Sequence, residues 1–544
     1  MAVRDLQREV AAYGCVGLLA VALNQHHGFL GYMPLDQSIV YNGAWRILNG
    51  QLPYVDFWLP FGLVPILLQS LLFLLLGVSW TAYVLQASLF NALFAASMVF
   101  LGRRLGLGLG VATLYGILAA VVAYPPMATP YVDQHAAIFS AWLLAAVLLG
   151  IRDPGTGRRW WLVAPPLGLL ALLSKPVPSA YALLAGGLAL GVAAGLQKRW
   201  HDLRRVALGA GLWGVATLVA LWWAGVTWEL FSTQALRAPL AVAAERAGLA
   251  AAAASDGAGA VADGGIAPAE LGRRALLAAI HALALLPTAA ALVFAARARR
   301  VEAWTLPLFA AAAFGIAVLF MALTRNQPAS ALALVALSWV LAHAALQRPV
   351  PSLAAGAAVV AATATALMLA NWVAPRYLND FEGGVPPGVD GAVISPQLAH
   401  LQWSMPPFAA HLDDDGADSY RRLVAELRRL PAPPVIVSDS VLYPLIGRAP
   451  VPPALFWHRD LSFPATGPAR DAFDARFRGD ILRAGSDLVV MDGPRTWMHV
   501  RLSEFPWLVT CLRLDATREI GRFSLIPLDR ACLARQPAGR PGAG

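Results

Sequence analysis

Two carboxylates and a guanidinium stand in one polar stretch of the sequence, between two long apolar runs. The stretch spans residues 33–61 and contains Asp36, Arg46 and Asp56. A carboxylate can take a proton from a reacting hydroxyl, and a guanidinium can hold an anion through two parallel hydrogen bonds. Acid–base chemistry is therefore one explanation for this stretch, and the alternative is that Asp36 is a solvated helix cap or an interfacial charge.

Further polar side chains stand where other apolar runs end. They are Gln37 and Tyr54 in the first stretch, Tyr131, Asp133, Gln134 and His135 in a second, and Lys175, Arg237, Arg325 and Asn326 at later run ends. The three cations suit an anionic lipid headgroup, although such side chains can also simply extend along lipid to the headgroup layer. The sequence lacks the phosphate-loop, dinucleotide-binding and zinc-protease motifs of soluble enzymes.

The composition places these residues in a membrane protein. Of the 544 residues, 58% are hydrophobic and 13% are charged, whereas soluble domains carry roughly a quarter charged residues. The net charge of +9 does not indicate a nucleic acid partner. Residues 1–373 hold the whole excess, with 22 basic and 13 acidic side chains, against 19 of each in residues 374–544. Most of those basic residues fall in loops on one side, which is typical of cytoplasmic loops.

Apolar runs of about 20 residues predict transmembrane helices. Arg4 and Arg8 precede the first run, which has no cleavage pattern, so we interpret it as a signal anchor with its N-terminus inside. A count of about eleven spans then puts the C-terminus outside. The predicted spans are residues 10–30, 80–101, 107–123, 135–151, 160–174, 177–196, 206–226, 275–296, 301–323, 329–346 and 353–373.

The apolar run at residues 60–77 is an exception among these segments. If it crossed the membrane, Arg103 and Arg104 would lie outside, against the distribution of the other basic residues. The run is short and bounded by proline and glycine, so we expect a helix at the outer interface or a re-entrant helix. A hairpin of two full spans is the alternative. The first extracytoplasmic loop then contains both the polar stretch and this interfacial helix.

Residues 374–544 differ from the apolar part in their prolines and balanced charge. One helix is predicted at residues 418–430, and strands are predicted in PVIVSD, SDLVVMD and RFSLIPL. We therefore expect a small extracytoplasmic α/β domain after a transmembrane module of residues 1–373. Cys511 and Cys532 lie in this domain, where they form either a disulfide or two buried thiols.

Several phrases of the sequence resemble one family of membrane enzymes. They are Asp36 followed by PYVDF and Pro60, LLLGVSWTA at residues 74–82, TPYVDQHAAIFS, LLSKP, and VIVSDSVLYPLIGRAP. In this order they resemble the GT-C superfamily of glycosyltransferases. Within it they are most similar to the family 39-like group, which contains protein O-mannosyltransferases and lipid A aminoarabinose transferases. The resemblance covers most of the chain in layout, and its specific residues lie in the first 180 positions.

The resemblance implies a reaction and roles for particular residues. Family members move a sugar from a polyprenyl-phosphate donor to a hydroxyl group in one inverting step. Asp36 matches the catalytic base, Asp133 matches the acid of the second loop, and Lys175 matches a lysine that contacts the donor phosphate. Gln37 stands where the family usually has a second acid, and Arg325 matches only part of an Arg-Tyr motif.

These observations together predict an inner-membrane glycosyltransferase with a polyprenyl-phosphate sugar donor, set among membrane lipids. Its acceptor is expected to be an envelope glycan, lipid or protein. No cofactor is required in the family, and a divalent cation held by Asp36 and Asp133 is the alternative. A transporter or flippase of a lipid-linked saccharide is the second candidate, although the ionisable residues gather at span ends rather than in mid-span. An inactive scaffold is the third.

Overall fold

The chain folds into two compact units that each draw on separate parts of the sequence. The first comprises Met1–Gly28, Ala87–Ala220 and Ala243–Asn379, and the second comprises Phe29–Gln86, Leu221–Val242 and Asp380–Gly544. Two segments of the predicted transmembrane module, Phe29–Gln86 and Leu221–Val242, therefore pack with the C-terminal residues. The computed structural model describes residues 2–153, 158–242, 244, 268–298, 301–324, 331–373, 388–405, 416–438, 440–459, 461–464, 466–492 and 502–536.

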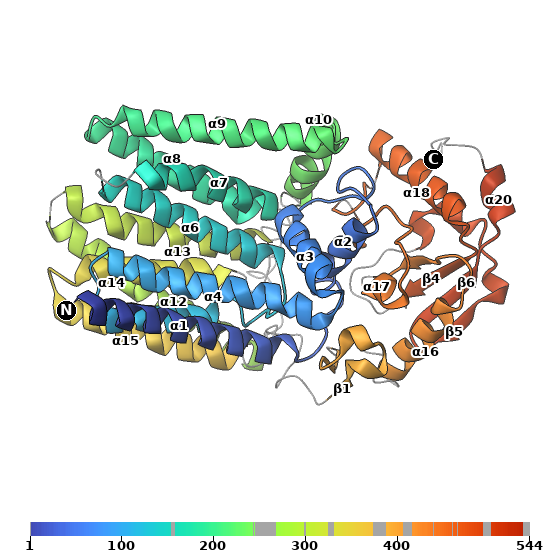
Figure 1. Ribbon diagram of the computed structural model, residues 1–544, viewed down its shortest axis with the longest axis horizontal. Helices are drawn as coiled ribbons and strands as arrows, with labels where there is room; N and C mark the ends of the chain where they lie inside the picture. Colours follow the sequence, from blue (N-terminus) through green and yellow to red (C-terminus); the bar gives the residue numbers. More distant parts are fainter. Residues whose placement is uncertain are drawn as a thin grey trace. The chain divides into compact units, whose positions relative to one another are not determined.

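The first unit is a bundle of apolar helices whose axes run side by side (Figure 1). Its helices are α1 (Ala2–Gly28), α4 (Trp80–Arg104), α5 (Leu109–Val122), α6 (Val132–Arg152), α7 (Arg158–Ser174), α8 (Pro176–Leu196), α9 (Trp200–Trp223), α12 (Pro268–Ala298), α13 (Thr305–Thr324), α14 (Leu332–Leu346) and α15 (Pro351–Met368). Because α6 and α14 are buried along nearly their whole length, they form the centre of the bundle. α6 packs against α7 and α8, and α14 packs against α13 and α15.

Each predicted span coincides with one of these helices, which confirms a multi-pass helical membrane protein. Seven helices of the described chain are long and apolar enough to cross a bilayer, and α5, α7, α13 and α14 are shorter. Small residues let the helices approach closely. A Cβ atom added to Gly150 of α6, for example, would lie 2.5 Å from the Trp161 ring of α7. α12 begins at Pro268, before the predicted start at residue 275, because backbone hydrogen bonds continue a helix beyond its apolar part.

The two ends of the bundle differ in their charged groups. At one end, Arg103 Nε donates to Glu9 at 2.8 Å, and Arg199 Nη1 donates to a carbonyl in the last turn of α6 at 2.9 Å. At the other end, Asn24 Nδ2 donates to the carbonyl of Ala128 at 2.9 Å, just before α6 begins. The arginine-rich end is the one that the positive-inside pattern assigns to the cytoplasm.

The second unit joins the predicted first loop to the C-terminal residues. The loop forms α2 (Ile39–Leu48) and α3 (Leu63–Leu76), and a later segment adds α10 (Trp228–Phe231) and the π-helical turn η1 (Ser232–Arg237). α3 packs against α2 and belongs to this unit rather than to the bundle. Its last turn exposes Leu74 and Leu75, which suits a helix in contact with lipid at an interface.

A four-stranded sheet forms the core of the C-terminal residues, in the order β3-β4-β6-β5. β3 (Val435–Val437) is parallel to β4 (Leu488–Asp492), and β6 (Phe523–Pro527) is antiparallel to both β4 and β5 (Arg518–Ile520). The three predicted strands are β3, β4 and β6. The remaining elements are the predicted helix α16 (Ala417–Arg428), α17 (Leu442–Ile446), α18 (Pro468–Ala484), α19 (Pro506–Val509), α20 (Arg530–Arg535) and the pair β1 (Val389–Asp390) and β2 (Gln402–Trp403).

Cys511 and Cys532 form a disulfide bond, which decides between the two alternatives left open by the sequence. Cys511 follows α19, and Cys532 lies in α20. The bond therefore joins the last helix of the described chain to the rest of the sheet domain. Cys15 in α1 is a free thiol.

Thiol labelling of the purified chain tests this pairing. Denaturation in the presence of a maleimide is expected to label one cysteine, Cys15, and labelling after reduction is expected to reach all three cysteines. A Cys15→Ser variant should give no label before reduction and two labels after it. Three labels without reductant would contradict the disulfide.

Candidate functional site

Asp36 is the one partly exposed side chain in an otherwise buried turn of the second unit. Every other residue in the segment 31–41 is buried. The amide of Gln37 donates to the carbonyl of Met33 at 3.2 Å, and further backbone hydrogen bonds close the turn around Asp36. The turn thus presents a carboxylate from a buried, hydrogen-bonded frame, which is the arrangement that a general base requires.

Gln37 helps to close the same turn. Its Oε1 accepts a hydrogen bond from the amide of Met33 at 2.8 Å, and its carbonyl accepts one from the Tyr83 hydroxyl at 2.9 Å. The side chain is fully buried, so an acid here would place a second charge in a costly position. The turn therefore carries a single acid, and contact between Gln37 and a substrate stays a prediction.

Asp56 is held by its own loop and by α18. Its Oδ2 accepts from the amide of Leu52 at 2.7 Å, and its Oδ1 accepts from Arg476 Nη2 at 2.6 Å. Arg476 also donates to the carbonyl of Val55. Both carboxylate oxygens of Asp56 have donors within the protein, so these contacts support a structural role, and its predicted substrate contact is not tested.

Arg46 lies in α2 and is buried against a C-terminal segment. Its Nη2 donates to the carbonyls of Pro452 at 2.8 Å and Ala454 at 2.7 Å, and its guanidinium carbon lies 5.2 Å from the centre of the Phe57 ring. Burial lowers the pKa of Arg46 to about 10, which still leaves the group charged at neutral pH. These contacts hold two segments together, and a role in substrate binding stays a prediction.

Tyr54 is buried in the same loop, with its ring 5.4 Å from that of Phe231 in α10. Gln234 links the loop to η1, because its Nε2 donates to the carbonyl of Tyr54 at 2.9 Å and its Oε1 accepts from the amide of Leu59 at 2.8 Å. Arg237 ends η1 and is exposed. Unlike Arg46, it is open to an anionic ligand.

In the first unit, Asp133 and Lys175 form an ion pair. Asp133 stands in the first turn of α6, and Lys175 immediately precedes α8. Lys175 Nζ lies 2.5 Å from Asp133 Oδ1, the Asp133 side chain is fully buried, and the Lys175 side chain is 14% exposed. The ammonium also lies 5.3 Å from the centre of the Phe320 ring. A partly exposed lysine side chain can donate a charge-assisted hydrogen bond to a phosphate oxygen.

Three predicted neighbours of Asp133 hold the same end of the bundle together. His135 Nδ1 lies 2.9 Å from the Tyr124 hydroxyl and 3.0 Å from the carbonyl of Tyr131. Gln134 Nε2 donates to a carbonyl at the end of α5 at 3.2 Å. All three predicted residues are buried. These contacts support a structural role, and substrate contacts for Tyr131, Gln134 and His135 stay predictions.

The contacts of Asp133 do not favour the divalent cation that the sequence left as an alternative. Among the described residues, no group of three or more His, Cys, Asp or Glu side chains could hold a metal ion. Oδ1 of Asp133 already has the ammonium of Lys175 at 2.5 Å, and a cation at the same oxygen would be repelled by it. Arg325 and Asn326 lie outside the described residues.

Two residues that hold the first loop are not identified by reasoning from the sequence. Gln234 offers a weak signal, because it is a polar residue near the end of an apolar run. Arg476 offers none, since an arginine in a polar helix usually faces solvent. It lies 420 positions from Asp56, so only the folded chain brings the two together.

The chain shares its fold with two solved structures of ArnT. ArnT from Cupriavidus metallidurans in the apo state matches it with a TM-score of 0.51 and 17% identity, over 96% of this chain and 99% of that chain. ArnT from the same organism bound to undecaprenyl phosphate matches with a TM-score of 0.50 and 16% identity, over 96% and 98%.

No protein-family model and no curated protein matches the sequence. At the identities of the ArnT structures, the likeness shows the fold alone, and one fold can serve several chemistries. The resemblance to the GT-C superfamily is therefore confirmed at the level of the fold. The reaction has to be argued from the residues of this chain.

Replacing Arg46 tests its structural role. In Arg46→Gln, the buried carbonyls of Pro452 and Ala454 lose a charged donor, which is expected to cost about 3 kcal/mol of unfolding free energy. The matched control is Arg237→Gln, an exposed arginine of the same unit, for which a change within about 0.5 kcal/mol is expected. Denaturant unfolding of the solubilised protein measures both, and equal stabilities of the two variants would contradict the assignment.

Proposed function

We propose that this protein is a glycosyltransferase that moves a sugar from a polyprenyl-phosphate donor to a hydroxyl group of an extracytoplasmic acceptor, with inversion. The acceptor is an envelope glycan, lipid or protein. The GT-C fold supports a membrane enzyme of this type, and a solved structure of the same fold is bound to undecaprenyl phosphate. The proposal goes beyond the fold because it assigns roles to residues of this chain.

The proposal rests mainly on the position of Asp36, a partly exposed acid in a buried turn. Asp36 is partly exposed, whereas every other residue between residues 31 and 41 is buried. A helix cap would direct its carboxylate to backbone amides, but the N-cap position of α2 is occupied by Ser38, two residues later. The position of Asp36 therefore fits a group that meets a substrate better than one that stabilises a helix.

In the proposed reaction, the acceptor hydroxyl gives its proton to the carboxylate of Asp36 as its oxygen attacks the anomeric carbon. The bond between that carbon and the phosphate oxygen breaks, and its electron pair leaves with the polyprenyl phosphate. A single displacement from the opposite face inverts the anomeric configuration. A general base of this kind typically contributes a rate factor of about 10² to 10⁴.

The leaving phosphate needs cations, because negative charge develops on it as the bond breaks. We assign this role to Lys175, whose side chain is 14% exposed and whose ammonium pairs with Asp133. In this role Asp133 orients the ammonium rather than taking a proton itself. Arg237, exposed at the end of η1, is a second candidate for contact with the phosphate, and the same role for Arg325 rests on the sequence alone.

We further propose that the C-terminal domain faces the extracytoplasmic side of the inner membrane. The disulfide between Cys511 and Cys532 supports this orientation, because disulfides persist in oxidising compartments and are rare in the cytosol. The sequence supports it as well, because basic loops favour the cytoplasm and a count of about eleven predicted spans then puts the C-terminus outside. A flippase for the same lipid would also need this orientation, and the two candidates differ in whether a glycosidic bond is made.

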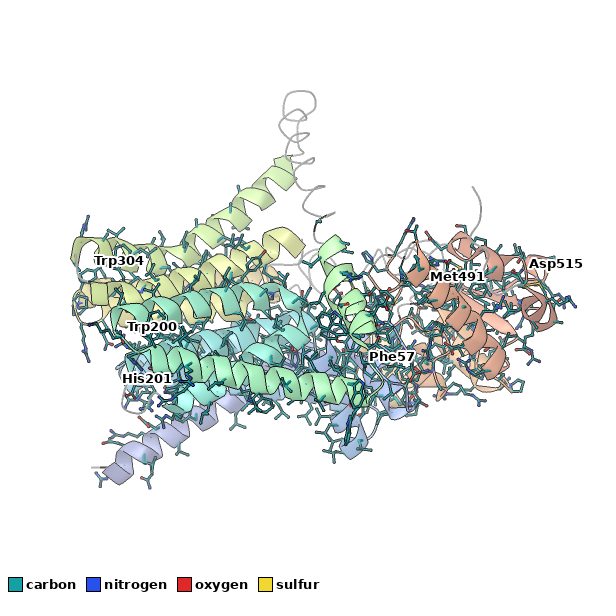
Figure 2. All side chains as sticks on the ribbon, turned by 90° about the horizontal axis from the view of Figure 1, so that it is seen from above. Phe57, Trp200, His201, Trp304, Met491 and Asp515 are labelled. Carbon is teal, nitrogen blue, oxygen red and sulfur yellow. A yellow bond between two sulfur atoms is a disulfide. The ribbon has the colours of Figure 1, made fainter. Side chains whose placement is uncertain are left out.

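Substitution of Asp36 separates these candidates. Asp36→Asn is expected to lower sugar transfer from a labelled polyprenyl-phosphate sugar at least 100-fold, because the amide cannot take the proton, while expression and melting temperature stay unchanged. The matched control is Asp515→Asn, an exposed acid of the same unit (Figure 2), which should transfer at the wild-type rate. Near-normal transfer by Asp36→Asn would remove Asp36 as the base. Lipid translocation without transfer by the wild type would favour the flippase.

The two lysines of the sequence, Lys175 and Lys198, provide a matched test of phosphate binding at opposite ends of α8. Lys175→Gln is expected to weaken undecaprenyl phosphate binding about tenfold or more, the worth of a charge-assisted hydrogen bond. Lys198→Gln, at an exposed position, should bind like the wild type. In Lys175→Gln alone, the buried carboxylate of Asp133 would lose its partner and could destabilise the fold. The double variant Lys175→Gln/Asp133→Asn removes that charge, so weak undecaprenyl phosphate binding by the folded double variant is the decisive result. Wild-type affinity in it would contradict the assignment.

A further inference from the structure

The turn that carries Asp36 is attached to the C-terminal domain through its own backbone. The amide of Gly31 donates to the carbonyl of Gln402 at 3.0 Å, and the amide of Tyr32 donates to the carbonyl of Ser404 at 2.7 Å. In return, the amide of Gln402 donates to the carbonyl of Phe29 at 2.8 Å. The chain entering the turn thus pairs with β2 through a bridge between Leu30 and Gln402, and all of these residues belong to the second unit.

Tyr32 adds two side-chain contacts to this attachment. Its ring stacks on that of Trp403 with a centroid distance of 4.6 Å and an angle of 18° between the planes. Its hydroxyl accepts a hydrogen bond from the amide of Val441 at 3.2 Å and shares another, of 2.8 Å, with the Ser38 hydroxyl. Tyr32 and Ser38 lie on either side of Asp36, so this last bond closes the turn, while Val441 connects it to the residues that begin α17.

The conformation of the turn needs such support. Leu35, directly before Asp36, has a φ of 70°, a left-handed conformation that is disfavoured for residues with a side chain and persists where surrounding contacts hold it. Burial raises the pKa of Tyr32 to about 12, so its hydroxyl keeps its proton at neutral pH. The Ser38 hydroxyl is available to Tyr32 because it does not cap α2 within the described chain.

We infer that the C-terminal domain positions Asp36 for its reaction through Tyr32, whose hydroxyl joins Ser38 to the Val441 amide. Tyr32 is then a positioning residue, since it acts through the turn and not on the substrate. The inference rests on the proposed role of Asp36 as a base. It also assigns a function to the C-terminal domain, which holds the turn of the first loop.

A matched pair of variants tests the positioning role. Tyr32→Phe keeps the stacked ring and removes the hydroxyl, and it is expected to lower kcat about tenfold to 100-fold with KM within twofold of the wild type. Tyr41→Phe is the control, because Tyr41 is also fully buried and its hydroxyl has no hydrogen-bond partner anywhere in the described chain. It should leave kcat and KM unchanged. Equal kcat values for the two variants would overturn the inference.

Ser38 supplies an independent check on the same hydrogen bond. Ser38→Ala should lower kcat like Tyr32→Phe, and Ser38→Thr, which keeps the hydroxyl, should restore most of the rate. Because both changes remove the hydrogen bond between Tyr32 and Ser38, the double variant Tyr32→Phe/Ser38→Ala should be no slower than the slower single variant. Multiplied losses in the double variant, or a Thr variant as slow as the Ala variant, would contradict a shared bond.

Hydrogen–deuterium exchange separates failure of this inference from failure of the proposed function. Tyr32→Phe is expected to speed amide exchange in the peptide covering residues 33–40 at least tenfold, and Tyr41→Phe is expected to leave it unchanged. If the wild type transfers no sugar but exchange is still faster in Tyr32→Phe, the positioning contact is supported and the proposed glycosyltransferase activity is rejected. Unchanged exchange in Tyr32→Phe would reject the positioning contact whatever the activity.

Discussion

The pairing of the chain at Phe29–Tyr32 with the backbone beside β2 is the interaction on which the candidate base depends. It holds the entrance of a turn in which one residue has a left-handed backbone and one acid is partly exposed. A free loop of this length would sample many conformations, and ordering each residue costs about 1–2 kcal/mol. Backbone pairing and the stacked ring of Trp403 offset that cost, because they satisfy polar groups and bury aromatic surface together.

Buried charge follows the same rule in both units, since each buried ion has a partner that repays part of its desolvation. Arg46 binds backbone carbonyls, and the ion pair of Asp133 and Lys175 neutralises two charges at the end of two helices. The difference between these sites is exposure. Arg46 is 3% exposed, whereas the Lys175 side chain is 14% exposed. A protein group that binds substrate must stay partly accessible, and this distinguishes a candidate site from a structural contact of similar composition.

Much of the fold could be predicted from the sequence, because the length of an apolar run and the distribution of arginines are local properties. Each predicted span lies on a helix, and the strands β3, β4 and β6 follow their apolar runs. Asp36 was recognisable as a carboxylate in a polar stretch between two long apolar runs. The contacts of Arg46 and Asp56 were not, because their partners lie about 400 positions away in the chain. Residue type alone does not tell a buried structural arginine from one that binds a phosphate.

The sequence by itself determined that this is a multi-pass membrane protein with a small α/β domain, since hydrophobic length and strand patterning are set within about 20 residues. It also indicated Asp36 and Lys175 as candidates for chemistry. Only the tertiary structure decided that Cys511 and Cys532 are bonded, that Asp133 is the partner of Lys175, and that the first loop belongs with the C-terminal residues. These outcomes depend on contacts between residues far apart in the chain, and no local pattern carries that information.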